Sequence, residues 1–179
     1  IFARLVLNLK RPTVGLLNVG SEQQKGHEEL REASAILRQI DLPMEFIGFV
    51  EGDDITAGTV DVIVTDGFSG NIALKAAEGT SRMFTFFLKE AFGSSIYSKI
   101  GYVLSKTAIN QVRERMDPRK YNGAVFLGLN GIAVKSHGST DSFGFANAIG
   151  VAADMSEYGF LDKVKDELRI LHAEGEASE

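Results

Sequence analysis

The sequence predicts an α/β protein with a mostly parallel sheet, and three observations lead to this fold class. Short apolar runs alternate with helical patterns along most of the chain, as in successive strand–helix–strand units. Three of the apolar runs end in polar loops that contain glycine and open onto a helix. The run 60–65 is almost entirely β-branched, which is typical of a strand that is buried on both faces.

The predicted strands and helices follow one another in the order expected for this class. The strand candidates are 13–19, 44–50, 60–65 and 124–129, with 131–135 as a further one. The helix candidates are 26–41, 71–92, 95–116, 140–157 and 160–173. In the first of these helices Leu30, Leu37 and Ile40 recur at helical spacing, which predicts one apolar face.

The three glycine-containing loops carry the groups that bind an anion. Lys25, Lys75 and Lys135 each lie in one of these loops or next to it. Glycine lets the backbone come close to a ligand, and a helix N-terminus offers unpaired N–H groups to an anion. On one parallel sheet the loops would meet at the carboxyl ends of the strands, where open α/β sheets bind ligands. The sequence therefore predicts a protein that binds a phosphate-like group.

The stretch 71–116 interrupts the alternation of strands and helices. Its two helical patterns follow each other without a strand and meet near residues 92–95, which predicts a helical hairpin that stands off the sheet. Such a hairpin is too rich in phenylalanine, tyrosine, isoleucine and leucine to bury them against itself. Two interpretations stay open, a subunit interface and a tip that contacts a membrane or a protein partner. We expect residues 1–173 to form one α/β domain with this hairpin, and 174–179 to be a frayed tail.

Composition excludes several classes of protein. The chain has 179 residues, of which 44% are hydrophobic and 24% charged, as in ordinary soluble globular proteins. A net charge of −5 argues against a general nucleic-acid binder. The absence of cysteine excludes disulfides, thiolate metal sites and a cysteine nucleophile, and it is compatible with a cytoplasmic location. No apolar run approaches the roughly 18 residues of a membrane span. Residues 1–9 resemble the end of a helix, so we expect the chain to be part of something longer.

Charge is unevenly distributed along the chain. Residues 82–120 contain eight lysines and arginines against three acidic residues, a local charge of +5 within a chain of −5. Such a reversal indicates either an acidic partner, an anionic membrane surface, or simply a solvated helix face.

Familiar catalytic and binding motifs are absent. No two glycines lie two residues apart, as a dinucleotide-binding loop requires, and the spacing of Gly15 and Gly20 continues with Ser21 in place of the lysine of a P-loop. The three histidines lack zinc-ligand spacing, and no G-x-S-x-G elbow is present. The remaining candidates are polar residues at strand ends: Asn18, Lys25, Asp66, Ser69, Asn71, Lys75, Lys135 and His137.

Each of these candidates also has a purely structural interpretation. Lys25 can be a surface lysine, although a cation near a helix start is unfavourable. Asn71 can be a helix N-cap with Asp66 closing a turn. Lys75 can be a solvated helix residue, and His137 a structural hydrogen-bonding group. Either Ser139 or Thr140 is expected to cap the helix that follows.

Four stretches together resemble the PlsX family of bacterial phosphate acyltransferases of phospholipid synthesis. They are 14–22 with Lys25-Gly26, 46–52, 66–71 with 74–75 and 78–79, and 135–139. The resemblance runs in order from about residue 12 to residue 154. Because members of that family are much longer, it implies that this chain is a C-terminal portion.

The resemblance implies a fold, a reaction and partners. The reaction is transfer of a fatty acyl group from acyl carrier protein to inorganic phosphate, which gives acyl phosphate. The implied fold is a three-layer α/β/α sandwich related to isocitrate and isopropylmalate dehydrogenases. The resemblance also implies a homodimer, with the helical hairpin near its interface, and a cytoplasmic protein that associates peripherally with the membrane.

This chemistry suits the residues at the strand ends. The enzyme must hold phosphate near the thioester and stabilise an oxyanion, and lysines, asparagine amides and loop N–H groups do both, so we expect neither a cofactor nor a metal. We assign Lys25 and Asn71 to the reacting centre, with Lys135 and His137 as secondary candidates. The expected phosphate-binding residues are Asn18, Gly20, Glu22, Asp66, Gly67, Ser69, Gly70, Lys75 and Gly138.

Two alternatives stay open. One is a dehydrogenase on the related fold, which would need metal-binding carboxylates such as Asp53 with Asp54, or Asp61 with Asp66. The other is a catalytically silent module that binds the carrier protein or a membrane.

Overall fold

The computed structural model describes the backbone of residues 1–176 and the side chains of residues 1–170. The chain divides into two compact units, which are described separately below. The first comprises residues 1–81 with 170–179, and the second comprises residues 82–169. The predicted single domain over 1–173 therefore remains a prediction.

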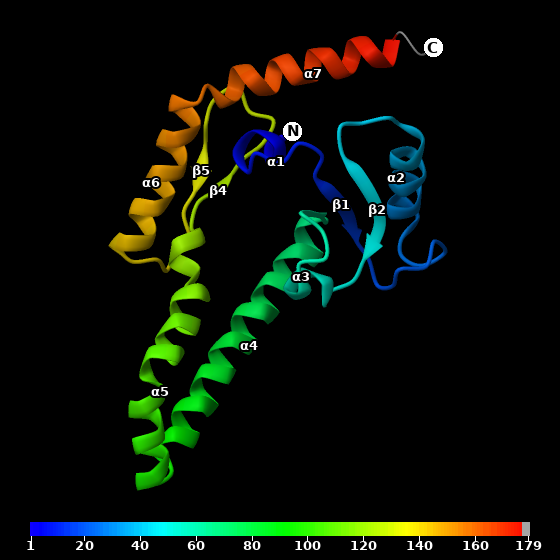
Figure 1. The fold of residues 1–179 in the computed structure, drawn as a ribbon. Helices are drawn as coiled ribbons and strands as arrows, with labels where there is room; N and C mark the ends of the chain where they lie inside the picture. The colour runs from blue at the N-terminus through cyan, green and yellow to red at the C-terminus, as the bar shows by residue number, and fades with distance from the viewer. Residues whose placement is uncertain (177–179) are drawn as a thin grey trace. The chain divides into compact units, whose positions relative to one another are not determined.

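A three-stranded parallel sheet forms the centre of the first unit (Figure 1). Its strands are β1 (Thr13–Leu17), β2 (Glu45–Val50) and β3 (Val62–Val64), in the order β2-β1-β3. Helix α1 (Phe2–Val6) precedes β1, α2 (Glu28–Gln39) connects β1 to β2, and α3 (Asp54–Ala57) connects β2 to β3. The predicted α/β class and the parallel sheet are confirmed, although α3 was not expected.

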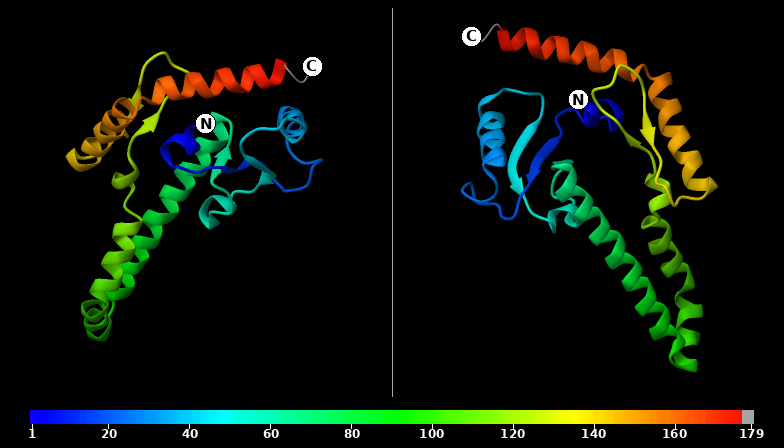
Figure 2. Two further views of the ribbon diagram at one scale, coloured as in Figure 1. Left: turned by 45° about the horizontal axis from the view of Figure 1, so that its top comes forward. Right: turned by 180° about the vertical axis from the view of Figure 1, so that it is seen from behind.

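The core of this unit lies around the central strand. Val14 and Leu16 of β1 are buried, as are Phe49 and Val50 of β2. Gly15 lies between them because a Cβ at this position would come 2.6 Å from Val50 Cγ1. Helix α2 runs beside β2 in both views (Figures 1 and 2), and its Arg38 guanidinium lies over the Phe46 ring, 5.5 Å from the ring centre.

Strand β3 differs from the prediction. It was expected over 60–65 and buried on both faces, but it covers only Val62–Val64, and Val64 is 47% exposed. The reason is that β3 pairs with β1 alone and is an edge strand of this sheet. Just before it, Asp61 accepts hydrogen bonds from the N–H and the hydroxyl of Thr13, both at 2.8 Å, which aligns the starts of β1 and β3.

Helices dominate the second unit. Helix α4 (Gly67–Gly93) enters it at Arg82, and α5 (Ile96–Arg115), the 3₁₀ helix η1 (Pro118–Tyr121), α6 (Ser142–Glu157) and most of α7 (Phe160–Glu176) follow. All five predicted helices of the chain are present, with ends shifted by up to four residues. Residues 174–176 of the predicted frayed tail continue α7, and 177–179 lie outside the described residues.

The strands of the second unit correct the prediction of one sheet. Strands β4 (Ala124–Val125) and β5 (Val134–Lys135) are short and pair antiparallel with each other in a separate sheet. Only eight residues connect them, 126–133, which is too few for the crossover between parallel neighbours. The loop that follows β5 therefore does not extend from the parallel sheet of the first unit.

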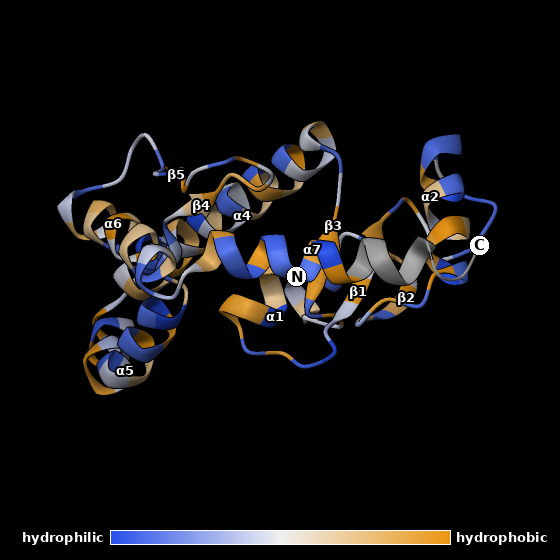
Figure 3. Ribbon diagram, turned by 90° about the horizontal axis from the view of Figure 1, so that it is seen from above, coloured by the Kyte–Doolittle hydropathy of each residue, from blue (hydrophilic) through white to orange (hydrophobic). Residues whose placement is uncertain are grey.

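Helices α4 and α5 are consecutive, as predicted, and are separated only by Ser94 and Ser95. Ser95 caps α5 by accepting a hydrogen bond from Ser98 N at 3.0 Å, and the rings of Phe92 and Tyr102 meet edge to face at 5.3 Å. Apolar and polar residues both occur around α5 (Figure 3). Large apolar side chains that are more than half exposed include Phe84, Phe86, Ile96, Tyr97, Val103 and Leu104.

The further expectation, that this pair of helices projects from the sheet, stays a prediction. Among the described residues, no helix combines the length and the apolar character needed to cross a membrane.

Candidate functional site

Asn18 closes the loop that follows β1. Its side chain is buried, its Nδ2 donates to the Lys25 carbonyl at 3.0 Å, and its Oδ1 accepts from Val19 N at 2.9 Å. Its own N–H donates to the Val50 carbonyl of β2 at 2.8 Å. The amide is therefore used to hold the backbone of the loop, which makes Asn18 a residue that shapes the loop around Lys25.

Two glycines allow this loop to close. Gly26 has a φ of +87°, and a Cβ there would overlap the Oδ1 of Asn18. A Cβ on Gly20 would overlap the Cδ of Lys25. The first position needs glycine for both its backbone angle and its close contact, whereas the second needs it so that the lysine side chain can lie across the loop.

Lys25 forms an ion pair within its own loop. Its Nζ lies 2.8 Å from Glu22 Oε2, and the two side chains are 47% and 49% exposed. The hydrogen bond to Glu22 raises the pKa of Lys25, and the same bond lowers the pKa of Glu22. Next to this pair, Glu51 accepts a hydrogen bond from Ser21 N at 3.2 Å. Because an ammonium group has three N–H donors, an anion can share Lys25 with Glu22 or replace it, and an exposed pair allows replacement at little cost.

Asp66 caps helix α4, which begins immediately after β3. Its Oδ1 accepts from Phe68 N and Ser69 N, each at 2.9 Å. The Ser69 hydroxyl, followed by the Ser69 N–H, lowers the pKa of Asp66. Because Asp66 is the cap, the interpretation of Asn71 as an N-cap is wrong.

Asn71 lies one turn into α4 and is exposed. No described residue forms a hydrogen bond with its amide side chain, so its N–H groups are available to a ligand. One turn later Lys75 pairs with Glu78 at 2.9 Å. A Cβ on Gly67 would meet nothing within 4 Å, whereas a Cβ on Gly70 would come 2.6 Å from the Thr65 methyl group.

The two loops of the first unit occupy the same edge of the sheet. β1 and β3 are parallel neighbours, with Leu16 opposite Val64, so the loop 18–26 and the start of α4 both follow the carboxyl ends of adjacent strands. No hydrogen bond or ion pair joins Asn18, Glu22 or Lys25 to Asp66, Ser69 or Asn71 within the described part of the chain. The site thus places the exposed ammonium group of Lys25 and the exposed amide of Asn71 at the carboxyl end of the sheet, the first in the loop 18–26 and the second in the second turn of α4.

The third predicted loop lies in the second unit and follows β5. Lys135 ends that strand and is exposed. His137 accepts at Nδ1 from Ser139 N at 3.3 Å, its Nδ1 also lies 3.0 Å from the Ser139 hydroxyl, and its carbonyl accepts from Thr140 N at 3.1 Å. A Cβ on Gly138 would meet nothing within 4 Å. The loop and the start of α6 line an open pocket of about 470 Å³.

Asn122, which the sequence analysis missed, holds this loop. It is 9% exposed, and its Nδ2 donates to Ser136 Oγ at 2.9 Å and to the Gly144 carbonyl at 2.7 Å. Its Oδ1 accepts from His137 N at 2.9 Å. The Asn122-Gly123 pair signals a turn in the sequence, but no local pattern indicates partners this far along the chain.

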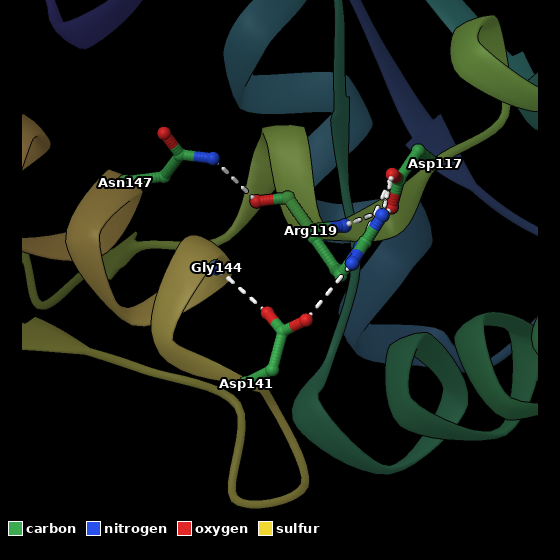
Figure 4. Close-up of polar contacts among 5 residues, drawn as sticks. All are labelled: Asp117, Arg119, Asp141, Gly144 and Asn147. Atoms are coloured by element: carbon green, nitrogen blue, oxygen red, sulfur yellow. Dashed lines mark hydrogen bonds and ion pairs between the residues drawn. The ribbon is translucent and has the colours of Figure 1, made fainter.

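Arg119 forms a second long-range connection that the sequence analysis missed (Figure 4). It donates to both oxygens of Asp117, with Nη2 at 2.7 Å, and its Nη1 donates to Asp141 Oδ2 at 2.8 Å. The bonds from Arg119 lower the pKa of Asp117 to about 2. Asp141 also caps α6 by accepting from Gly144 N at 3.1 Å, so the expected cap at Ser139 or Thr140 is wrong.

The carboxylates of Asp54, Asp61 and Asp66, named for a metal site, are already hydrogen-bonded within the protein. Asp54 accepts from Glu51 N at 2.8 Å and from the Thr59 hydroxyl at 2.9 Å, and Asp61 accepts from Thr13. Asp66 is the cap of α4. Among the described residues, no group of three or more histidine or acidic side chains is placed to hold a metal ion. The dehydrogenase alternative gains no support from these residues.

Comparisons with known proteins show what the chain is similar to. The family described as fatty acid synthesis protein matches residues 1–163. A phosphate acyltransferase of Rhodospirillum centenum is 61% identical over 99% of the chain and 50% of its own length. Those of Paramagnetospirillum magneticum and Agrobacterium fabrum are 59% and 58% identical, over 93% and 96% of the chain and 48% and 49% of their own lengths.

These matches cover most of the chain at high identity, and the predicted family resemblance is confirmed. The chain spans about half the length of the curated relatives that it matches. It belongs to the fatty acid synthesis protein family, the PlsX family that its four sequence motifs indicated.

Proposed function

We propose that this chain contributes the reacting centre of a phosphate acyltransferase, which moves a fatty acyl group from the thioester of acyl carrier protein to inorganic phosphate. One observation carries the proposal. The adjacent parallel strands β1 and β3 end at the same sheet edge, and there they deliver the Lys25 loop and the exposed Asn71. A cation for phosphate and an amide donor for an oxyanion are the two groups that this transfer needs.

In the proposed reaction a phosphate oxygen attacks the thioester carbonyl carbon. A carbon–oxygen bond forms, the carbon–sulfur bond breaks, and the leaving thiolate takes a proton from water. Phosphate is already an anionic nucleophile at neutral pH, so no covalent enzyme intermediate is required. Lys25 leaves Glu22 and binds phosphate, while the Asn71 amide donates a hydrogen bond to the oxyanion of the tetrahedral intermediate.

The other predicted residues take supporting roles in this proposal. Asn18, Gly20 and Gly70 shape the loops, and Asp66 with Ser69 holds the start of α4. Gly67 and Gly138 have open space beside them, into which phosphate or the thioester can approach. Lys75, Lys135 and His137 are secondary candidates for phosphate and leaving-group contacts.

We extend the proposal to the architecture and the partners. The parallel sheet belongs to a three-layer α/β/α sandwich, and α4 with α5 forms a projecting hairpin near a homodimer interface. Because acyl carrier protein is acidic, exposed basic residues of the hairpin such as Lys99, Lys106 and Arg113 steer it. The exposed aromatic residues Phe84, Phe86 and Tyr97 equally suit peripheral contact with a membrane, and measurement must choose between these two roles.

Phosphate-dependent release of free thiol from long-chain acyl carrier protein tests the reaction. It is measured on this chain, on a full-length relative as a positive control, and on a chimera that carries residues 1–179 behind the N-terminal half of that relative. Release by the chimera, lost on Lys25→Ala or Asn71→Ala in a folded variant, supports the assignment. A chimera that binds acyl carrier protein without turnover, while the relative is active, indicates a binding module instead.

The salt dependence of thiol release tests the role of the hairpin. Neutralising Lys99, Lys106 and Arg113 together should raise the KM for acyl carrier protein at low salt and flatten the dependence of KM on ionic strength. An unchanged salt dependence, with reduced binding to anionic vesicles, assigns the basic residues to the membrane.

A further inference from the structure

Asn122 connects three segments of the second unit. It follows η1, and its side chain reaches Ser136 and His137 at the end of β5 and Gly144 in the first turn of α6. These partners lie 14, 15 and 22 residues away in the sequence. The one amide thus holds the start of the 136–141 loop against the helix that follows it.

The side chain of Asn122 makes three hydrogen bonds, and all three go to the loop and to α6. Both donor bonds have short distances, 2.9 Å to Ser136 Oγ and 2.7 Å to the Gly144 carbonyl, and the acceptor takes the His137 N–H at 2.9 Å. A buried amide with both N–H donors and its oxygen hydrogen-bonded rigidifies its surroundings, because any displacement leaves a polar group without a partner. The backbone of His137 is therefore set by Asn122.

The far end of the loop is held independently. Asp141 accepts from Arg119 Nη1 at 2.8 Å and caps α6 through Gly144 N (Figure 4). Between these two anchors, the His137 ring is oriented by Ser139, whose N–H and hydroxyl lie 3.3 Å and 3.0 Å from Nδ1. The imidazole thus takes its place from the loop conformation, and the loop takes its conformation from Asn122 and Arg119.

We infer that Asn122 is a positioning residue, which acts on turnover through the backbone of His137. The inference rests on the proposed function, since it assumes that the His137 loop takes part in the transfer. Asn122 touches no reacting group in this assignment. Its effect on catalysis depends on His137 being present.

A double-mutant cycle in the active chimera tests the inference. Asn122→Ala and His137→Ala should each lower kcat for thiol release by about the same factor, with KM for acyl carrier protein unchanged. The double variant should be no slower than His137→Ala alone, because the two residues act in series. Independent, multiplying effects would overturn the inference, and so would a His137→Ala variant with normal turnover.

Asn147→Ala is the matched control. Asn147 also bridges α6 and η1, donating to the Arg119 carbonyl at 2.8 Å over 28 residues, but it bonds to no residue of the 136–141 loop. Its effect on kcat should be small and should multiply with that of His137→Ala. Coupling to His137 equal to that of Asn122 would show that any loosening of this unit slows the enzyme, which overturns a specific role for Asn122.

Amide hydrogen exchange gives a second readout on the same chimera. The His137 N–H should exchange at least about tenfold faster in Asn122→Ala and at the wild-type rate in Asn147→Ala, because only the first variant removes its acceptor. If Asn122→Ala fails to fold, Ser136→Ala removes a single bond of the amide and should lower kcat in the same direction. If the chimera releases no thiol while the full-length relative is active, both the proposed function and the positioning role of Asn122 are wrong. An active chimera with an unchanged His137 exchange rate overturns the inference alone.

Discussion

Two polar loops, one in each compact unit, are each held by a buried asparagine, and the two differ in how far these asparagines reach. The side chain of Asn18 bonds to residues one and seven positions away, within its own loop. Asn122 bonds to residues 14, 15 and 22 positions away, on two other elements. The Asn18 side chain thus closes the Lys25 loop through local contacts, whereas the Asn122 side chain holds the His137 loop through contacts that exist only in the assembled second unit.

The same contrast holds for charge. Lys25 pairs with Glu22, three residues before it, whereas Arg119 joins Asp117 to Asp141 across 22 residues. Local pairs can exchange for a ligand without disturbing the rest of the unit. Long-range pairs stabilise the arrangement of elements, so we expect chemistry at the first loop and support at the second.

Substituting Asn71 should have the largest effect on turnover, and the result sharpens the contrast between the units. Asn71→Ala should lower kcat for thiol release roughly 10²–10³-fold, which is typical for the loss of one oxyanion donor. His137→Ala should cost less than about tenfold, since a thiolate leaves with little need of an acid. Steady-state kinetics of the chimera measure both.

The thermal stability of these two variants serves as the control. Asn71 is exposed and lies inside α4, where alanine is the better helix former, so its Tm should not fall. A larger kinetic effect for His137→Ala than for Asn71→Ala would move the reacting centre to the second unit and break the contrast drawn above.

Removing the two buried asparagines should separate local from long-range support. Asn122→Ala should lower the free energy of unfolding by about 1–3 kcal/mol, because it leaves the Gly144 carbonyl without that donor. Asn18→Ala should cost less, since its loop is at the surface and its partners can turn to water. Urea unfolding of each variant gives the two values, and equal or reversed costs would contradict the distinction.

Gly26→Ala tests the local closure of the Lys25 loop. A side chain at φ +87° is strained, and its Cβ would overlap Asn18 Oδ1, so we expect a loss of about 1 kcal/mol or more. Gly138→Ala is the matched control for stability, because nothing lies within 4 Å of its Cβ position. Equal stabilities of the two variants would show that the loop does not depend on this contact.

The smallest effect should be a pH dependence at the Arg119 cluster. Asp117 has a pKa of about 2 when folded and an ordinary value of 3.8. Between these two pH values the unfolded chain binds more protons than the folded chain. The contribution of Asp117 to the free energy of unfolding should therefore be fully present above about pH 4 and be lost as pH decreases towards 2. Asp117→Asn should flatten that part of the Tm profile, and salt should weaken the effect because Arg119 is 48% exposed. A profile identical to that of the wild type would remove the cluster from this role.

Much of the first unit could be predicted from the sequence because its determinants are local. The apolar runs around Val14 and Phe49 predicted β1 and β2, and the glycine-containing segments after β1 and β3 predicted both loops. Asp66 was predicted to close a turn before a helix capped by Asn71, whereas it caps α4 itself. The pattern around 60–65 predicted a doubly buried strand and was wrong, because β-branched residues do not reveal whether a strand is at the edge.

The second unit was harder to predict, for a physical reason that its residues show. Strands β4 and β5 were expected to continue the parallel sheet, yet their eight-residue connection permits only antiparallel pairing. The cap of α6 was expected at Ser139 or Thr140, yet Asp141 occupies that place because Arg119 holds its second oxygen. The short connection between β4 and β5 is a local feature, whereas the Arg119 partner of Asp141 lies 22 residues away in the sequence.

The sequence by itself therefore determined the family, the α/β class, the helices and the short list of polar residues at strand ends. Motif order, hydrophobic periodicity and turn residues are local properties, and they can be read directly from the amino-acid sequence. Only the tertiary structure decided that Asn71 has no partner among the described residues, and that Asn122 and Arg119 hold the His137 loop. Those facts depend on which distant groups meet in space, and a hydrogen bond across 15 or 22 residues exists only after the chain has folded.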